Sequence, residues 1–143
     1  MKLTHENLVD LLCTATYGST WLDCSAPNKN GINVEDSDCR EDIWARVLLS
    51  GGKIECIDYY AEGDVYSALG RIDEDEDGIY AIGLKDIERG LRKAMNGTFK
   101  GDDEEKAWAR KCYSHFIDGD GAVDNPEAEC LMQIIMFNEI IYG

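Results

Sequence analysis

The sequence predicts an α+β fold with about five helices and a small antiparallel β-sheet of two to three strands. Apolar residues recur at helical spacing in five separate segments, whereas polar and apolar residues alternate between the second and third of these segments. The length of 143 residues is typical of one domain, and no long segment rich in Pro, Gly or Ser interrupts the chain. We therefore expect residues 1–143 to form a single acidic α+β domain.

The first predicted helix follows Thr4, a residue type that caps helices through its side-chain oxygen. It is expected to end near Gly18, and its apolar stripe consists of Leu8, Leu11, Leu12 and Ala15. Residues 19–36 contain Pro27, Asn28, Asn30 and Gly31, so we expect a turn-rich loop there. Trp21 lies in this loop, where an exposed aromatic side chain could anchor a binding partner.

The second helix is expected to begin after Ser37 or Asp38 and to end at the glycine pair 51–52. Beyond it, residues 53–59 are rich in β-forming side chains, and residues 78–82 have the pattern of an antiparallel partner strand. The link between them, residues 61–77, could hold an additional strand at 65–72. These segments form the predicted sheet between the second and third helices.

Three more helices are predicted in the second half of the chain. One spans residues 84–96, and the next begins in the acidic turn 102–105, where carboxylates suit the positive end of the helix dipole. The last helix has Asn125 as its cap and Pro126 in its first turn. Its residues through Tyr142 are apolar nearly all round, which is typical of a helix covered on several sides. We expect this C-terminal helix to be central in the core.

Charge is the most unusual property of the chain: 29 acidic residues against 14 basic ones give a net charge of −15. Such a surface repels nucleic acid and anionic lipid, because each phosphate contact needs a Lys or Arg. We therefore expect no direct binding to nucleic acid or to a membrane, whereas a basic protein would be attracted. Two runs concentrate the acidic residues, namely Asp73, Glu74, Asp75, Glu76 and Asp77, and Asp102, Asp103, Glu104 and Glu105. The first run could imitate the phosphate spacing of nucleic acid.

The sequence contains no recognisable catalytic pattern. Neither of its two histidines, His5 and His115, belongs to a known triad or metalloprotease motif, and no Gly-rich phosphate loop occurs. We therefore expect the protein not to be an enzyme. The N-terminus lacks the apolar core of a signal peptide, and no apolar run approaches the ~20 residues of a membrane span. The six cysteines are therefore expected to be free thiols in a reducing cytoplasm, most of them buried.

Two segments resemble parts of metal sites. Residues 73–78 match the first half of an EF-hand calcium loop, but Leu84 stands where the closing Glu is required. Cys112 and His115 lie one helical turn apart and could present two zinc ligands. The other two ligands would have to come from distant cysteines such as Cys13. We therefore expect no cofactor, with zinc and calcium as the alternatives.

Four short segments resemble a family of small acidic proteins encoded by bacteriophages and prophages. They are LLCTATYGSTW at residues 11–21, SGGKI at 50–54, LKDIERG at 84–90 and FNEIIYG at 137–143. Their order along the chain is more specific than any one of them. The chain departs from the family at Gly18, where the family usually has two glycines, and in a polar insertion over residues 24–38.

The resemblance implies a viral protein that acts in the cytoplasm of a bacterial host. Small acidic phage proteins of this kind bind and block host machinery that handles nucleic acid, such as restriction enzymes, polymerases and RNA-guided nucleases. Our first hypothesis is a non-enzymatic inhibitor of the anti-CRISPR type, which binds a basic host defence protein through the two acidic runs and Trp21. The alternatives are a module that is supported by zinc or sequesters a ligand, and an oligomeric phage accessory protein.

Overall fold

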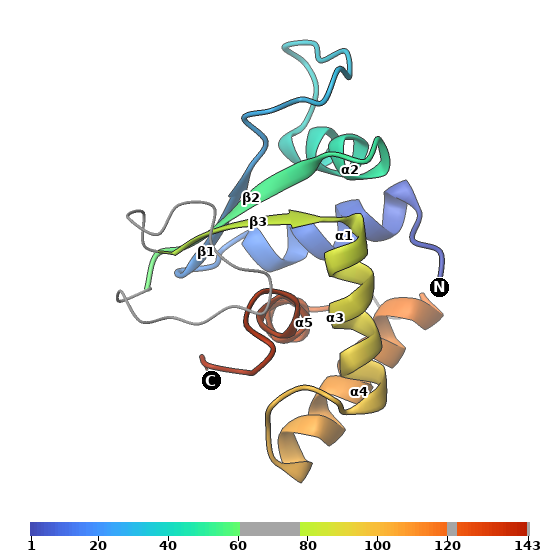
Figure 1. Ribbon diagram of the computed structural model, residues 1–143, viewed down its shortest axis with the longest axis vertical. Helices are drawn as coiled ribbons and strands as arrows, with labels where there is room; N and C mark the ends of the chain where they lie inside the picture. Colours follow the sequence, from blue (N-terminus) through green and yellow to red (C-terminus); the bar gives the residue numbers. More distant parts are fainter. Residues whose placement is uncertain (61–77, 120–122, 143) are drawn as a thin grey trace.

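The computed structural model describes residues 1–60, 78–119 and 123–142. Within these residues, five helices and a three-stranded antiparallel sheet form an α+β fold, as predicted (Figure 1). The elements in order are α1 (His5–Thr16), β1 (Leu22–Ser25), α2 (Arg40–Leu49), β2 (Lys53–Asp58), β3 (Ile79–Gly83), α3 (Leu84–Asn96), α4 (Asp103–Asp118) and α5 (Asn125–Phe137). The strand predicted at 65–72 and the acidic run 73–77 lie outside the described residues. None of the described helices is long and apolar enough to cross a membrane.

Capping boxes begin three of the helices. Thr4, Asp102 and Asp124 each accept a hydrogen bond from the backbone N–H of the third residue of α1, α4 and α5, respectively. In each case the side chain of that third residue accepts a hydrogen bond from the N–H of the capping residue. The cap of α5 is therefore Asp124, and the prediction of Asn125 is wrong by one residue.

The predicted caps of α2 are also wrong. Cys39 precedes the first residue of this helix and makes no side-chain capping bond. Asp38 has a different role, because its carboxylate accepts a hydrogen bond from the N–H of Glu35 and forms an ion pair with Arg46 at 3.2 Å. The Asp38 side chain therefore ties the preceding turn to the last turn of α2.

The sheet has the strand order β1-β2-β3, with both pairs antiparallel. Strands β2 and β3 lie between α2 and α3 as predicted, but β1 comes from the segment that we expected to be a loop. That expectation is wrong for residues 22–25, where buried Leu22 and Cys24 alternate with half-exposed Asp23 and Ser25. In the register, Cys24 lies opposite Cys56 of β2. A four-residue strand is too short to show a clear period in the sequence.

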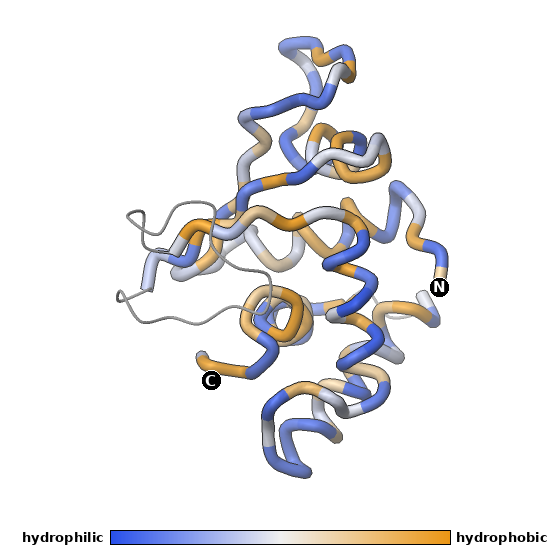
Figure 2. Tube along the Cα trace, viewed as in Figure 1, coloured by the Kyte–Doolittle hydropathy of each residue, from blue (hydrophilic) through white to orange (hydrophobic). Residues whose placement is uncertain are grey.

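Helix α5 is central in the core, as predicted. It packs against α1, α3 and α4 (Figure 1), and apart from Glu129 its residues 127–137 are all buried. In Figure 2, apolar residues gather along α5, whereas the chain of α3 is mainly hydrophilic. The helix ends at Phe137, because Asn138 adopts a left-handed conformation with φ of 59°. The prediction that the helix continues through Tyr142 is therefore wrong, and residues 138–142 form a C-terminal tail.

The cysteines are free thiols, and four of the six are buried, as we expected for most of them. The Sγ atoms of Cys24 and Cys56 lie 3.5 Å apart across the sheet. The hydrogen bond with Cys24, together with burial, raises the pKa of Cys56 well above its ordinary value. The hydrogen bond with Cys130, together with burial, likewise raises the pKa of Cys112. A protonated thiol is a poor nucleophile and metal ligand, so Cys56 and Cys112 contribute mainly to packing.

Candidate functional site

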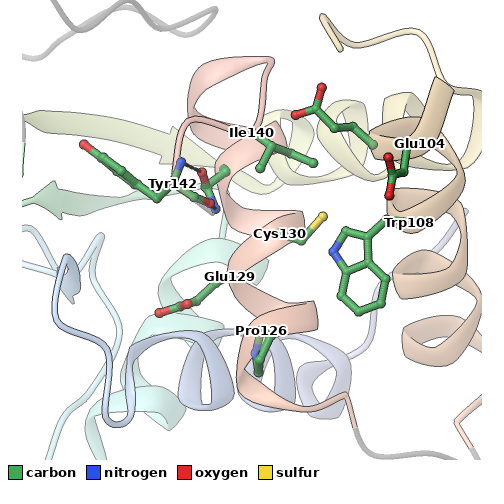
Figure 3. Close-up of a pocket in the computed structure, with 9 residues that line it drawn as sticks. Glu104, Trp108, Pro126, Glu129, Cys130, Ile140 and Tyr142 are labelled. Carbon is green, nitrogen blue, oxygen red and sulfur yellow. Dashed lines mark hydrogen bonds between the residues drawn. The ribbon is translucent and has the colours of Figure 1, made fainter. Parts of the chain in front are cut away.

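A groove lies between α4, α5 and the C-terminal tail, and we call it the α4–α5 groove (Figure 3). Its volume is about 420 Å³, which falls within the usual range of ligand pockets. Two helices and the tail supply its walls, and the lining residues are Glu104, Glu105, Trp108, Pro126, Glu129, Cys130, Gln133, Ile140 and Tyr142.

Helical spacing brings the lining residues of each helix onto one face. On α4, Glu104 and Trp108 are four residues apart and therefore lie one above the other along the helix. On α5, the lining residues at positions 126, 129, 130 and 133 follow the i, i+3, i+4, i+7 pattern of a single stripe. Since α4 and α5 pack against each other, these two faces form opposite walls of the groove.

The third wall is the C-terminal tail, which Gln133 holds in place. This side chain is only 3% exposed. Its Oε1 accepts hydrogen bonds from the N–H groups of Ile141 and Tyr142 at 2.8 and 2.7 Å, and its Nε2 donates to the carbonyl of Tyr142 at 3.1 Å. The Tyr142 hydroxyl donates to Asp58 Oδ2 at 2.7 Å. The tail is therefore fixed at both the helix and the sheet.

The groove is negatively charged. Glu104, Glu105 and Glu129 line it, and none of the lining residues that the structure describes is a Lys or Arg. Residues 112–143 contain six Asp or Glu and no Lys or Arg, whereas α4 itself also carries Lys106, Arg110 and Lys111. A low-dielectric wall next to clustered charges strengthens the local field. The groove is therefore suited to a cationic group.

Trp108 gives the groove an apolar, aromatic wall. Its side chain is 39% exposed. Figure 3 shows the indole beside Glu104 and near Cys130 of α5. Lys111 Nζ lies 5.8 Å from the ring centroid, a distance at which a cation is attracted by the aromatic face. The ring therefore already interacts with a cation of its own chain.

No family model, curated protein or solved structure matches this chain. The resemblance to phage proteins therefore stays a hypothesis.

The second predicted acidic run is divided by the structure. Glu104 and Glu105 enter the groove, whereas Asp102 caps α4 and Asp103 is exposed without lining the groove. The first run, Asp73, Glu74, Asp75, Glu76 and Asp77, lies outside the described residues. Two carboxylates of the sequence-predicted binding surface are therefore placed at a concave site, and Glu129 joins them from a different helix.

The prediction that Trp21 is an exposed anchor is wrong. Its side chain is 3% exposed and packs against the rings of Phe137 and Tyr142, with centroids 5.8 and 5.1 Å away. A side chain covered by its own chain cannot reach a partner. Trp108 is the tryptophan that lines the α4–α5 groove, and it was not among the binding residues predicted from the sequence. The signal that could have found it is the run of carboxylates one turn earlier in the same helix.

The zinc candidates Cys112 and His115 are not brought together with other ligands. Cys112 is buried beside Cys130, and His115 Nδ1 shares a hydrogen bond with Glu127 Oε2. Across the residues that the structure describes, no group of three or more His, Cys, Asp or Glu side chains could hold a metal ion. The calcium-loop candidate at 73–77 lies outside the described residues.

Proposed function

We propose that this chain is a phage-encoded, non-enzymatic inhibitor that acts in the cytoplasm of a bacterial host. It binds a basic, nucleic-acid-handling defence protein, such as a CRISPR nuclease, through an acidic surface centred on the α4–α5 groove. The observation that carries the proposal is the combination of three carboxylates and an exposed tryptophan in one groove, with no basic side chain among the lining residues that the structure describes.

An acidic surface is complementary to the basic surface of a protein that binds nucleic acid. An enzyme that binds nucleic acid lines its binding surface with Lys and Arg, which neutralise phosphates. Carboxylates on a rigid scaffold can pair with the same cations, and the net charge of −15 accelerates the encounter at low salt. The exposed indole of Trp108 adds apolar contact area, and tryptophan is enriched at binding hot spots. The inhibitor would then occupy the site that nucleic acid normally fills.

A pull-down from bacterial lysate tests this proposal. The tagged protein is incubated with lysate that contains restriction enzymes, polymerases and CRISPR nucleases, with and without nuclease treatment and at two salt concentrations. We expect mass spectrometry to identify a basic, nucleic-acid-binding enzyme that is captured after nuclease treatment and lost at high salt. Capture of a partner that binds no nucleic acid, independently of salt, would contradict the proposal.

Matched variants locate the binding surface in the same experiment. The groove variant Glu104→Gln, Glu105→Gln, Glu129→Gln removes three charges from the groove and should reduce capture. The control variant Glu35→Gln, Asp36→Asn, Asp103→Asn removes three charges at exposed positions outside it. Both variants have the same net charge. A difference in capture between them would therefore result from the groove carboxylates and not from the overall charge of the protein. Equal loss of capture in both would show that only net charge matters.

A further inference from the structure

Building on the proposed function, we infer that the α4–α5 groove recognises one arginine side chain with an apolar neighbour on an extended segment of the partner. The proposed function requires only an acidic surface and a basic partner. The shape and lining of the groove specify the occupant more narrowly, as a single cationic and planar group next to an apolar side chain.

The size of the groove limits what can enter it. A volume of about 420 Å³ between two helices and a fixed tail accommodates one or two side chains, and not a folded element. The walls are set before binding, because Gln133 secures the tail and the Asp102 capping box secures the start of α4. A preorganised site loses less conformational entropy when it binds. The groove is therefore suited to a protruding side chain.

The cationic half of the occupant is assigned by Trp108 and Glu104. A guanidinium is planar, stacks on aromatic faces and can bond a carboxylate with two parallel N–H groups. Figure 3 shows the carboxylate of Glu104 beside the indole, so a guanidinium stacked on the ring would lie near it. Lys111 Nζ lies 5.8 Å from the centroid of the same ring, so an incoming guanidinium would have to displace this ammonium or share the ring with it. Lysine would interact less well, because its ammonium cannot stack.

The apolar half is assigned by the floor of the groove. Ile140 of the tail is half-buried and presents apolar surface to the groove, whereas Cys130, which also lines it, is only 3% exposed. Figure 3 shows these two side chains next to each other and adjacent to Trp108. An aliphatic neighbour of the arginine would cover this floor and displace water from it. Part of the binding free energy should therefore come from apolar contact and remain at high salt.

An NMR titration of the full chain with a blocked Gly-Leu-Arg-Leu-Gly peptide tests the inference. The indole N–H of Trp108 is the reporter, and those of Trp21 and Trp44 are internal controls because both are buried. We expect a saturable shift of the Trp108 signal alone, with a dissociation constant on the order of 1 mM. A peptide with Gln in place of Arg should bind at least about fivefold more weakly, and one with Ser in place of both Leu residues about threefold more weakly.

Variants of the chain give the matched comparison. Glu104→Gln should weaken binding of the arginine peptide about two- to fivefold, whereas Asp103→Asn, one residue away and outside the groove, should leave it unchanged. Trp108→Leu, followed through the backbone amide of Ile140, should weaken it about tenfold. Equal binding of the Arg and Gln peptides, equal effects at 103 and 104, or a shift that does not saturate would each overturn the inference.

The peptide experiment is separate from the test of the proposed function. If the pull-down recovers a basic enzyme that only the groove variant fails to capture, but the arginine peptide does not bind, the inference is wrong and the proposed function stands. If the peptide binds as expected and no basic partner is captured, the proposed function is wrong and the groove remains an arginine site.

Discussion

Substitution of Gly90 by alanine tests the packing of α3 on α5. Gly90 is a buried residue in the middle of α3. A Cβ atom added there would lie 2.6 Å from the Cα of Ile135 and would also overlap its Cγ1. Real Cβ atoms do not approach other atoms so closely, and a backbone atom cannot rotate away. One of the two helices would therefore have to move.

The expected magnitude follows from two opposing effects. Alanine in a helix interior is more favourable than glycine by about 1 kcal/mol. Overpacking of a core costs about 1–3 kcal/mol, and the upper value applies where the obstacle is backbone. Gly90→Ala should therefore lower the free energy of unfolding by about 2 kcal/mol, a large part of the ~5–15 kcal/mol typical of a domain.

Chemical denaturation followed by circular dichroism measures this change. The paired variants Arg92→Gly and Arg92→Ala, at an exposed position two residues further along α3, give the effect of propensity alone and should favour alanine. Gly90→Ala could instead stabilise the protein by as much as Arg92→Ala exceeds Arg92→Gly in stability. In that case α3 would not pack against α5. The central position of α5 would then be wrong.

Three more predictions test other contacts. Burial raises the pKa of Asp58 above its ordinary value of 3.8. The difference in free energy of unfolding between the wild type and Asp58→Asn should therefore fall as pH rises from 3.8 to the raised pKa, and stay constant above it. Denaturation series of the two proteins that run parallel over this pH range would contradict the prediction. His115→Ala should lower the free energy of unfolding by about 1 kcal/mol, because buried Glu127 loses a hydrogen-bond partner. An unchanged midpoint of thermal unfolding would count against that contact. Removal of residues 134–143 deletes the last turn of α5 and should abolish cooperative thermal unfolding, and a cooperative transition in the truncated chain would refute the central role of this helix.

The helices could be predicted because their signals are local. Thr4 and the carboxylates at the starts of α4 and α5 act on residues within one turn, and the apolar stripes repeat along each helix. Strand β1 could not be predicted, because its pairing with β2 joins residues at least 30 positions apart and its own pattern covers four residues. The end of α5 was placed too late because Ile140 and Tyr142 are apolar, although Asn138 turns the chain away.

Only part of the candidate site could be predicted from the sequence. Glu104 and Glu105 stood out as part of an acidic run, but Glu129 and Ile140 belong to other elements and join them only through packing. The sequence also did not indicate which of the tryptophans is exposed and which is buried. Trp21 lies in an irregular segment, which suggested exposure, yet the fold buries it against the C-terminal tail.

The central claim is that the acidic α4–α5 groove takes the place of nucleic acid on a basic partner. Its most direct test is displacement of a fluorescent nucleic acid from the captured enzyme, measured by anisotropy with the wild type, the groove variant (104, 105 and 129) and the control variant (35, 36 and 103). We predict that the wild type and the control variant displace the probe, and that the groove variant needs about tenfold higher concentration. Equal displacement by the groove and control variants would contradict the account.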